Sequence, residues 1–251
     1  MSRDEAREQV SDRLITQLQR AHRVHAGREA EAERLRQWRQ LAAWQSARLQ
    51  NTYPDLLAHP RYRLAVAFFL EELYGPKDFS GRDADIQRAA PLIARMLPAE
   101  VVDTVADAME LNALSHELDE RLLHELRKCA EPRELDAQLY AEAYRSCDNE
   151  PDRRRQIELL AGVGRDLDRI VGKRLVQVAL KMMRTPARLA GFAELQQFLE
   201  QGLKAFSTMR GADHFLATVV RRETALMQRL FAGELPDPSA LDGPVQSPGW
   251  A

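Results

Sequence analysis

The chain has 251 residues, 45% of them hydrophobic, with 36 Lys and Arg against 38 Asp and Glu and only two cysteines. A formal net charge of −2 does not indicate a nucleic-acid or membrane partner, and two cysteines are too few for a disulfide scaffold. The longest apolar run, residues 64–70, is much shorter than the roughly 20 residues of a membrane span. We therefore expect neither a membrane span, nor a disulfide-rich domain, nor a collagen-like chain.

The composition strongly favours helices. Ala and Leu together contribute 69 residues, whereas the β-branched Val, Ile and Thr contribute 25. We therefore expect an all-α fold, a multi-helix bundle, instead of a predominantly β domain. Residues 1–52 are expected to form a long amphipathic helix, residues 53–233 the helical body, and residues 234–251 a disordered tail that contains four prolines.

The N-terminal segment has a heptad pattern. Residues 3–50 contain no proline, and eight of the twelve core positions between residues 10 and 49 are apolar. Charged Arg28 and Glu31 interrupt this seam near its centre. Such a helix would pair with a second copy as a coiled coil, or fold back on the body, and it is the expected surface for a homo-oligomer or a protein partner. The apolar core positions are Val10, Leu14, Ala21, Val24, Leu35, Trp38, Ala42 and Leu49.

The body is predicted to be a succession of helices. Residues 61–73 are apolar on almost every side, which is typical of a buried central helix. The pair Gly75–Pro76 then signals a helix end, and Ser80 begins a Ser-x-x-Asp start signal. Further helices are expected over residues 80–97, 98–129, 132–147, 151–184, 190–209 and 212–232, with interruptions at Gly162, Gly164 and Gly172 and a break at Thr185–Pro186.

The most distinctive segment is FFLEELYGPKDFSGRD, residues 68–83. It is followed by an EL-x-x-LS-x-x-LD pattern that begins at Glu110 and ends at Asp119. In these two segments the chain resembles a group of uncharacterised bacterial helical proteins that share an FFL-x-x-LYG-P-x-DF-x-x-RD segment. The resemblance covers roughly residues 60–230. It implies a common fold and carries no known activity or catalytic residue with it.

The same segment concentrates polar groups in a short loop between two predicted helices. Together with polar groups of the next helix, they would form an enclosed small-ligand or metal site. The alternative is that they only cap and connect the helix ends. We assign no metal ligand and expect no cofactor, because His116 lacks the second histidine of a zincin helix and no histidine follows an acid by three positions. The candidate residues are Tyr74, Lys77, Asp78, Arg82, Asp83, Glu110, Ser115 and Asp119.

Charge is segregated along the body. Residues 99–126 hold eight acids and one base, and Asp103, Glu110 and Glu117 recur every seven residues on one stripe. Residues 153–188 hold ten bases and three acids. The two faces would pair with each other, or the basic ridge, residues 165–188, would hold phosphate groups or a nucleic-acid backbone. The lack of interleaved aromatic residues argues against stacking of single-stranded nucleic acid, and a nucleic-acid partner is the weaker alternative. The candidate anion-binding residues, if one helix is continuous there, are Arg165, Arg169, Lys173, Arg174, Lys181 and Arg184.

No catalytic template fits the chain. It contains no Gly-x-Ser-x-Gly elbow, and Gly162-Val-Gly164 has neither a preceding strand nor the third glycine of a dinucleotide site. The N-terminus has no apolar signal segment, and Cys129 and Cys147 are expected to be free thiols, which favours a cytoplasmic protein. We therefore expect a non-enzymatic cytoplasmic helical protein that acts through self-association or a protein partner.

Overall fold

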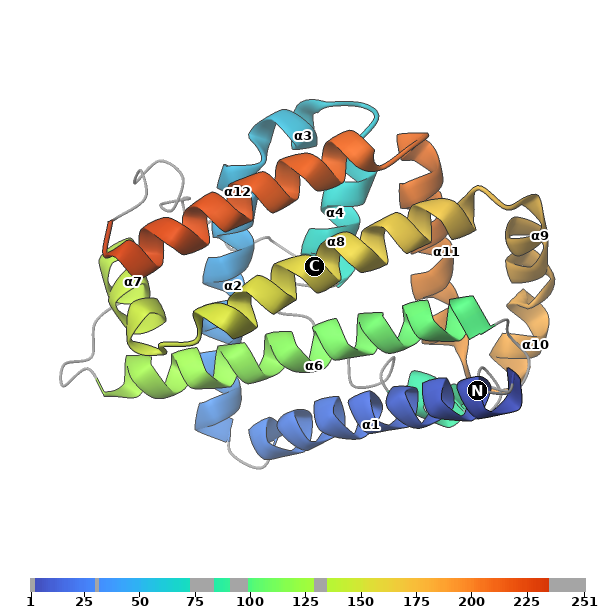
Figure 1. The fold of residues 1–251 in the computed structure, drawn as a ribbon, viewed down its shortest axis with the longest axis horizontal. Coiled ribbons are helices and arrows are strands. Elements are labelled where there is room, and N and C mark those ends of the chain that lie inside the picture. The colour runs from blue at the N-terminus through green and yellow to red at the C-terminus, as the bar shows by residue number, and fades with distance from the viewer. Residues whose placement is uncertain (1–2, 30–31, 73–83, 91–98, 129–134, 235–251) are drawn as a thin grey trace.

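The computed structural model describes residues 3–29, 32–72, 84–90, 99–128 and 135–234. All regular structure in these segments is helical, which confirms the all-α prediction (Figure 1). The helices are α1 (Arg3–Glu29), α2 (Ala32–Thr52), α3 (Pro54–Ala58), α4 (Arg63–Glu72), α6 (Ala99–Arg127), α7 (Ala137–Ser146), α8 (Glu150–Val171), α9 (Arg174–Met182), α10 (Arg184–Leu189), α11 (Ala193–Met209) and α12 (Asp213–Ala232), and residues 84–90 are also helical. Of the helices described, none is both long enough and apolar enough to cross a membrane.

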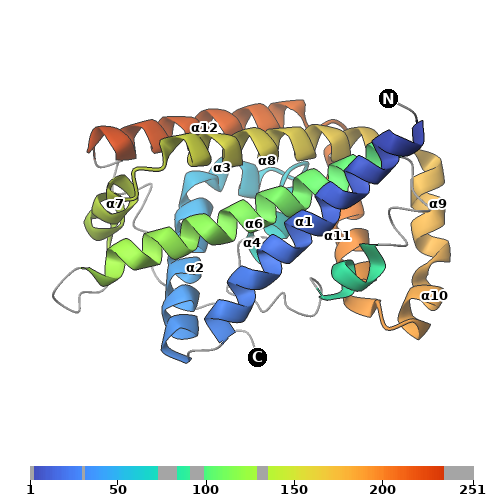
Figure 2. The same ribbon diagram turned by 60° about the horizontal axis from the view of Figure 1, so that its bottom comes forward.

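Helices α1, α6, α8 and α12 form one layer of the molecule. Figure 1 shows α6, α8 and α12 side by side, with α1 along the other side of α6, and each helix of this series contacts the next extensively. Helices α2, α4 and α11 run across this layer and form a second one (Figures 1 and 2). Helix α7 lies at one end of the layers, and α9 and α10 lie at the other end.

The predicted N-terminal helix is two helices in the structure. Helix α1 ends at Glu29, α2 begins at Ala32, and the two run in different directions (Figure 2). The charged positions that interrupt the heptad seam, 28 and 31, fall beside this boundary. A seam without apolar residues at its centre cannot stay buried along one straight helix, so each half packs against a different part of the body.

Helix α1 folds back on its own chain. Its residues Leu14, Leu18 and Ala21 are buried, and Leu14 and Leu18 belong to the same apolar cluster as Val102 and Ala106 of α6. Full burial of a leucine side chain contributes about 1.5–3 kcal/mol. Of the two arrangements that the heptad allowed, the structure therefore shows the intramolecular one.

Two further apolar clusters connect the layers. In the first, Trp38 and Trp44 of α2 are buried, and Trp44 stacks on Tyr140 of α7 with 4.1 Å between ring centroids. In the second, Ala65 of α4 is fully buried in a cluster that includes Phe206 of α11. The burial predicted for this helix is confirmed by this packing.

Two element boundaries differ from the prediction for local reasons. The helix expected over residues 132–147 begins at Ala137, because the Asp136 side chain accepts the N–H of Leu139 at 2.7 Å and caps the helix there. The break predicted at Thr185–Pro186 lies two residues earlier, at Met183 between α9 and α10, and α10 contains both Thr185 and Pro186. Pro186 lies in the first turn of that helix, where a missing N–H leaves no helical hydrogen bond unmade.

Helix α8 passes without interruption through both of its internal glycines. A Cβ atom at Gly164 would overlap the Leu216 side chain of α12, whereas one at Gly162 would have no atom within 4 Å. Gly164 therefore allows α8 and α12 to approach closely. The interruption predicted at Gly172 is confirmed, because α8 ends immediately before it.

Candidate functional site

Of the polar site predicted from the sequence, the structure describes only the part on α6. The other predicted residues, Tyr74, Lys77, Asp78, Arg82 and Asp83, lie outside the described segments. On α6, Ser115 Oγ accepts a hydrogen bond from Gln156 Nε2 at 2.8 Å, and Asp119 Oδ1 accepts one from Gln45 Nε2 at 3.1 Å. These side chains, like Glu110, connect α6 to neighbouring helices.

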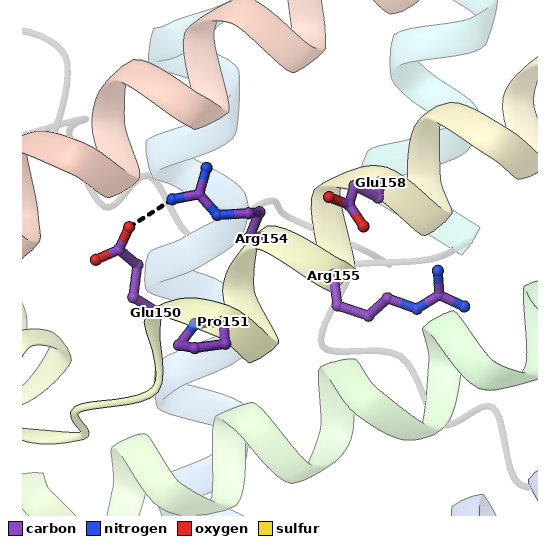
Figure 3. Close-up of a pocket in the computed structure, with 5 residues that line it drawn as sticks. All are labelled: Glu150, Pro151, Arg154, Arg155 and Glu158. Atoms are coloured by element: carbon purple, nitrogen blue, oxygen red, sulfur yellow. Dashed lines mark hydrogen bonds and ion pairs between the residues drawn. The ribbon is translucent and has the colours of Figure 1, made fainter.

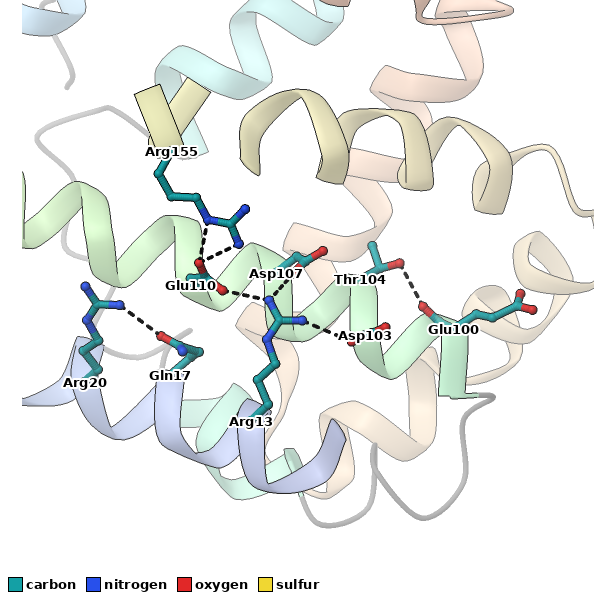
Figure 4. A network of polar contacts seen from close by, with 9 residues as sticks. All are labelled: Arg13, Gln17, Arg20, Glu100, Asp103, Thr104, Asp107, Glu110 and Arg155. Carbon is teal, nitrogen blue, oxygen red and sulfur yellow. Dashed lines mark hydrogen bonds and ion pairs between the residues drawn. The ribbon is translucent and has the colours of Figure 1, made fainter. Parts of the chain in front are cut away.

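The acidic stripe of α6 binds an arginine of α1 (Figure 4). Arg13 Nη1 lies 3.2 Å from Asp103 Oδ1, and Nη2 lies 2.7 Å from Glu110 Oε2 and also contacts Asp107. The second oxygen of Glu110 accepts hydrogen bonds from Arg155 Nε and Nη2 at 3.0 and 2.8 Å. Glu110 therefore joins three helices, α1, α6 and α8.

The register of α1 on α6 follows the same seven-residue spacing. Arg20 donates from Nε and Nη2 to the two carboxylate oxygens of Glu117, and Arg13, one heptad earlier, donates from Nη2 to one oxygen of Glu110. The two helices therefore run parallel. Burial raises the pKa of Glu110, but the hydrogen bonds from its two arginines lower it more, so the pKa lies below the usual range. The stripe is an attachment surface for α1.

The predicted acidic and basic faces pair in part. Glu110 binds Arg155 at 2.8 Å, and a second ion pair joins Arg121 of α6 to Asp152 of α8, with acid and base exchanged. Within the described segments, no group of three or more His, Cys, Asp or Glu side chains is placed to hold a metal ion. The described part of the stripe therefore offers ion pairs between helices.

A buried ion pair that sequence reasoning missed connects α2 to α12. Arg48, which is 8% exposed, donates from Nη1 to both oxygens of Glu223 at 2.8 and 2.9 Å, and the Tyr53 hydroxyl donates to the same carboxylate at 2.7 Å. Burial, and then the negative charge of Glu223, raise the pKa of Tyr53, so its hydroxyl stays a donor. The partners are 170 or more positions apart, and no local pattern signals their contact.

Arg153 of α8 is a second buried cation. It is 6% exposed, and its guanidinium carbon lies 4.5 Å from the centroid of the Tyr144 ring. Its Nε and Nη2 atoms have neither a hydrogen-bond partner nor solvent contact. The third guanidinium nitrogen, Nη1, donates to Gln156 Oε1 at 3.4 Å within the same helix. We therefore assign Arg153 a packing role.

A surface depression of about 410 Å³ lies along α8 (Figure 3). The described residues that line it all belong to this one helix, and they include Glu150, Arg154 and Glu158. Arg154 pairs with Glu150 at 2.7 Å. A single helix supplies only one wall, so this depression does not enclose a ligand or assemble a catalytic group of residues.

A smaller depression of about 290 Å³ lies between α2, α6 and Cys147. Arg34 and Glu120 on its wall form an ion pair at 2.6 Å. Burial raises the pKa of the Cys147 thiol. A reactive cysteine needs a lowered pKa, so this thiol has no activation for nucleophilic chemistry.

The predicted anion-binding residues do not share one helix face. Helices α8 and α9 are separate and run in different directions, so the assumed continuous ridge is wrong (Figure 1). Arg169 pairs with Asp166, and Arg184 donates to both oxygens of Glu200 at 2.6 and 2.7 Å. The remaining candidates, Arg165, Lys173, Arg174 and Lys181, are exposed.

The largest concentration of exposed apolar side chains lies on α9, α10 and the residue between them. Of the six large apolar side chains that are exposed in the described segments, four fall between residues 178 and 189. Met182 is 73% exposed and Leu189 is 81% exposed. We define the α9–α10 face as Val178, Met182, Met183 and Leu189 together with the exposed cations Lys173, Arg174, Lys181 and Arg188.

Hydrogen bonds from two glutamine side chains to backbone carbonyls connect α9 to the neighbouring helices at the end of the molecule. Gln196 of α11 donates to the Leu180 carbonyl at 2.8 Å, and Gln177 donates to the Val171 carbonyl at 3.0 Å. Between Asp168 and Glu194 the sequence contains six bases and no acid. The four cations of the α9–α10 face form no ion pair with any residue that the structure describes, so the face is both apolar and positively charged.

Residues 24–238 match the family model described as "Domain of unknown function (DUF8198)". The chain belongs to this family. Comparisons with curated proteins and with solved structures find no match to it. This match confirms the predicted resemblance to an uncharacterised family. The match also covers more of the chain than the sequence motifs suggested.

The DUF8198 match includes the whole α9–α10 face and the acidic stripe of α6. Arg13 and Arg20 of α1, which neutralise that stripe here, precede the matched range. The family model therefore covers the carboxylates of α6 in the α1–α6 contact, but not the two arginines of α1 that pair with them.

Proposed function

We propose that the protein is a non-enzymatic cytoplasmic protein that acts by binding another protein through the α9–α10 face. The observation that carries the proposal is the clustered exposure of Val178, Met182, Met183 and Leu189. Single exposed apolar residues are ordinary, whereas a contiguous group is typical of interaction sites. Burying a methionine or leucine side chain fully contributes about 1.5–3 kcal/mol, so this face would gain stability on association.

The charge of the face favours a different protein over a second copy as partner. A symmetric dimer would place the same cations of both copies opposite each other, which is unfavourable. The acidic stripe of a second copy is already bound by its own Arg13 and Arg20. The apolar stripe of α1, which the sequence suggested as the association surface, is engaged within the chain.

Two observations support the non-enzymatic part of the proposal. The smaller depression contains a thiol whose pKa is raised, and the larger one is lined by described residues of a single helix. Cys147 is a free thiol, which is consistent with a reducing compartment such as the cytoplasm.

The proposal is tested by removing the apolar part of the α9–α10 face while its charge is kept. Quantitative affinity purification from the host identifies the proteins that co-purify with the wild-type chain. We expect the double variant Met182→Ser/Leu189→Ser to lose these proteins. Leu199→Ser is the matched control, because Leu199 is an exposed leucine of α11 outside the face. Retention of the same proteins by all three chains would overturn the proposal. Light scattering measures the mass in solution. If the wild-type protein has twice the mass of one chain and the variant has the mass of one chain, the partner is a second copy.

A further inference from the structure

The partner segment that fits the α9–α10 face is limited by the kind of surface that the face offers. Addition of a strand requires an open sheet edge, and the described segments contain only helices. A polyproline ligand requires a groove lined by aromatic side chains, and the face has none. A short phosphorylated motif requires converging arginines, but Arg184 is bound to Glu200. The remaining common mode is an amphipathic helix laid on an apolar surface.

The apolar residues of the face have the spacing that such a helix requires. Val178 and Met182 are four residues apart on α9 and therefore lie one turn apart on the same side. Met183 lies between α9 and α10, Leu189 is the last residue of α10, and both side chains are exposed. Methionine side chains are unbranched and adjust to a partner, which suits them to docking a helix.

The positive charges of the face indicate that the partner segment carries negative charge. Arg174 and Lys181 lie in the same outward sector of α9 as Val178, and Arg188 adjoins Leu189. These cations have no ion pair with described residues, so a partner with carboxylates beside its apolar stripe would form new ion pairs there. A basic partner helix would oppose them.

The face also differs from a membrane-binding surface. Helices that lie in a membrane interface carry Trp, Phe or Leu along a long apolar side. Here the two helices have nine and six residues, and the exposed apolar residues include no aromatic one. We infer that the α9–α10 face binds an acidic amphipathic helix of a partner protein, which rests on the proposed function and adds the chemistry of the partner.

Designed peptides test this inference with the full-length chain. The probe is a fluorescein-labelled peptide of about 18 residues, five helical turns, with leucines on one side and glutamates beside them. A second peptide has lysine in place of every glutamate, and a third has the composition of the first without an apolar side. Fluorescence anisotropy measures binding at low and high salt, and vesicles containing phosphatidylserine are assayed in parallel by sedimentation.

We expect the glutamate peptide to bind, more weakly at high salt, and the other two peptides to bind at least about tenfold more weakly. Charge reversal by Lys181→Glu/Arg188→Glu should weaken binding of the glutamate peptide at least about tenfold and should strengthen binding of the lysine peptide. Arg39→Glu, an exposed arginine on α2, is the matched control and should change neither. A helical circular dichroism spectrum of each variant establishes that it is folded.

The outcomes separate this inference from the proposed function. Equal binding of the glutamate and lysine peptides, or of the peptide without an apolar side, would refute the acidic amphipathic helix. Vesicle binding without peptide binding would replace it with a membrane surface. If no peptide binds while Met182→Ser/Leu189→Ser still abolishes retention of a host protein, the partner chemistry is wrong and the proposed function stands. If that double variant retains everything, the proposed function itself fails.

Discussion

The buried ion pair between α2 and α12 allows the most direct test of the energetics described above. In Arg48→Met, the Glu223 carboxylate would lose the two hydrogen bonds of 2.8 and 2.9 Å and keep only that from Tyr53. Removing one partner of a buried pair costs about 3–5 kcal/mol, because the other charge stays desolvated. For a chain of this size that corresponds to a fall in Tm of about 6–20 °C.

Urea unfolding followed by circular dichroism measures this loss. The double variant Arg48→Met/Glu223→Met should be more stable than Arg48→Met alone, because it leaves no unpaired buried charge. Arg36→Met is the control: Arg36 forms an exposed ion pair with Glu33, and its loss should leave the unfolding midpoint unchanged. A loss below about 1 kcal/mol in Arg48→Met, or a double variant no more stable than the single one, would refute the reasoning.

Three further predictions follow from packing and titration. Arg153→Met should leave the free energy of unfolding unchanged or raise it by about 1 kcal/mol, because two guanidinium nitrogens are buried without partners; a loss above about 2 kcal/mol in urea unfolding would contradict this. Gly164→Ala should lower thermal stability because its Cβ would overlap Leu216, whereas Gly162→Ala, with open space, should raise it by up to about 1 kcal/mol; equal effects in calorimetry would contradict the close approach of the helices. Glu110 has a lowered pKa, so its contribution to stability is present above its unfolded pKa of about 4.3 and is lost as the pH falls through the lowered value. Glu110→Gln should therefore reduce the dependence of the urea midpoint on pH below about pH 5, and an unchanged profile would show that the lowered pKa does not contribute.

Much of the helical architecture was predictable because its signals are local. The apolar stripe of α6 and the α11 and α12 boundaries follow from helical periodicity and from glycines at the ends. The start of α7 was missed although its signal is also local, since Asp136 is a standard capping residue four positions after the proline that was taken as the start.

The candidate site was less predictable. Three of the four basic residues of the α9–α10 face were among the predicted anion-binding residues, and Arg188 was not. The separation of α9 from α8 and the exposure of Met182 and Leu189 were not predicted. A signal existed in the sequence: the stretch between Asp168 and Glu194 has six bases, no acid, and apolar residues one turn apart. Periodicity identifies such an apolar stripe, but it does not distinguish a stripe that faces the core from one that faces solvent.

The sequence by itself determined that the chain is helical, which residues share a side of each helix, and where charge is concentrated, because these properties depend on neighbours within a few positions. Only the tertiary structure determined which charged residues form ion pairs with each other. It paired Glu110 with Arg13 and Arg155, and Arg48 with Glu223, and it left the cations of the α9–α10 face exposed. The physical reason is that a charged stripe is compatible with any opposite stripe within reach, and the packing of the apolar sides of the helices determines which one lies there.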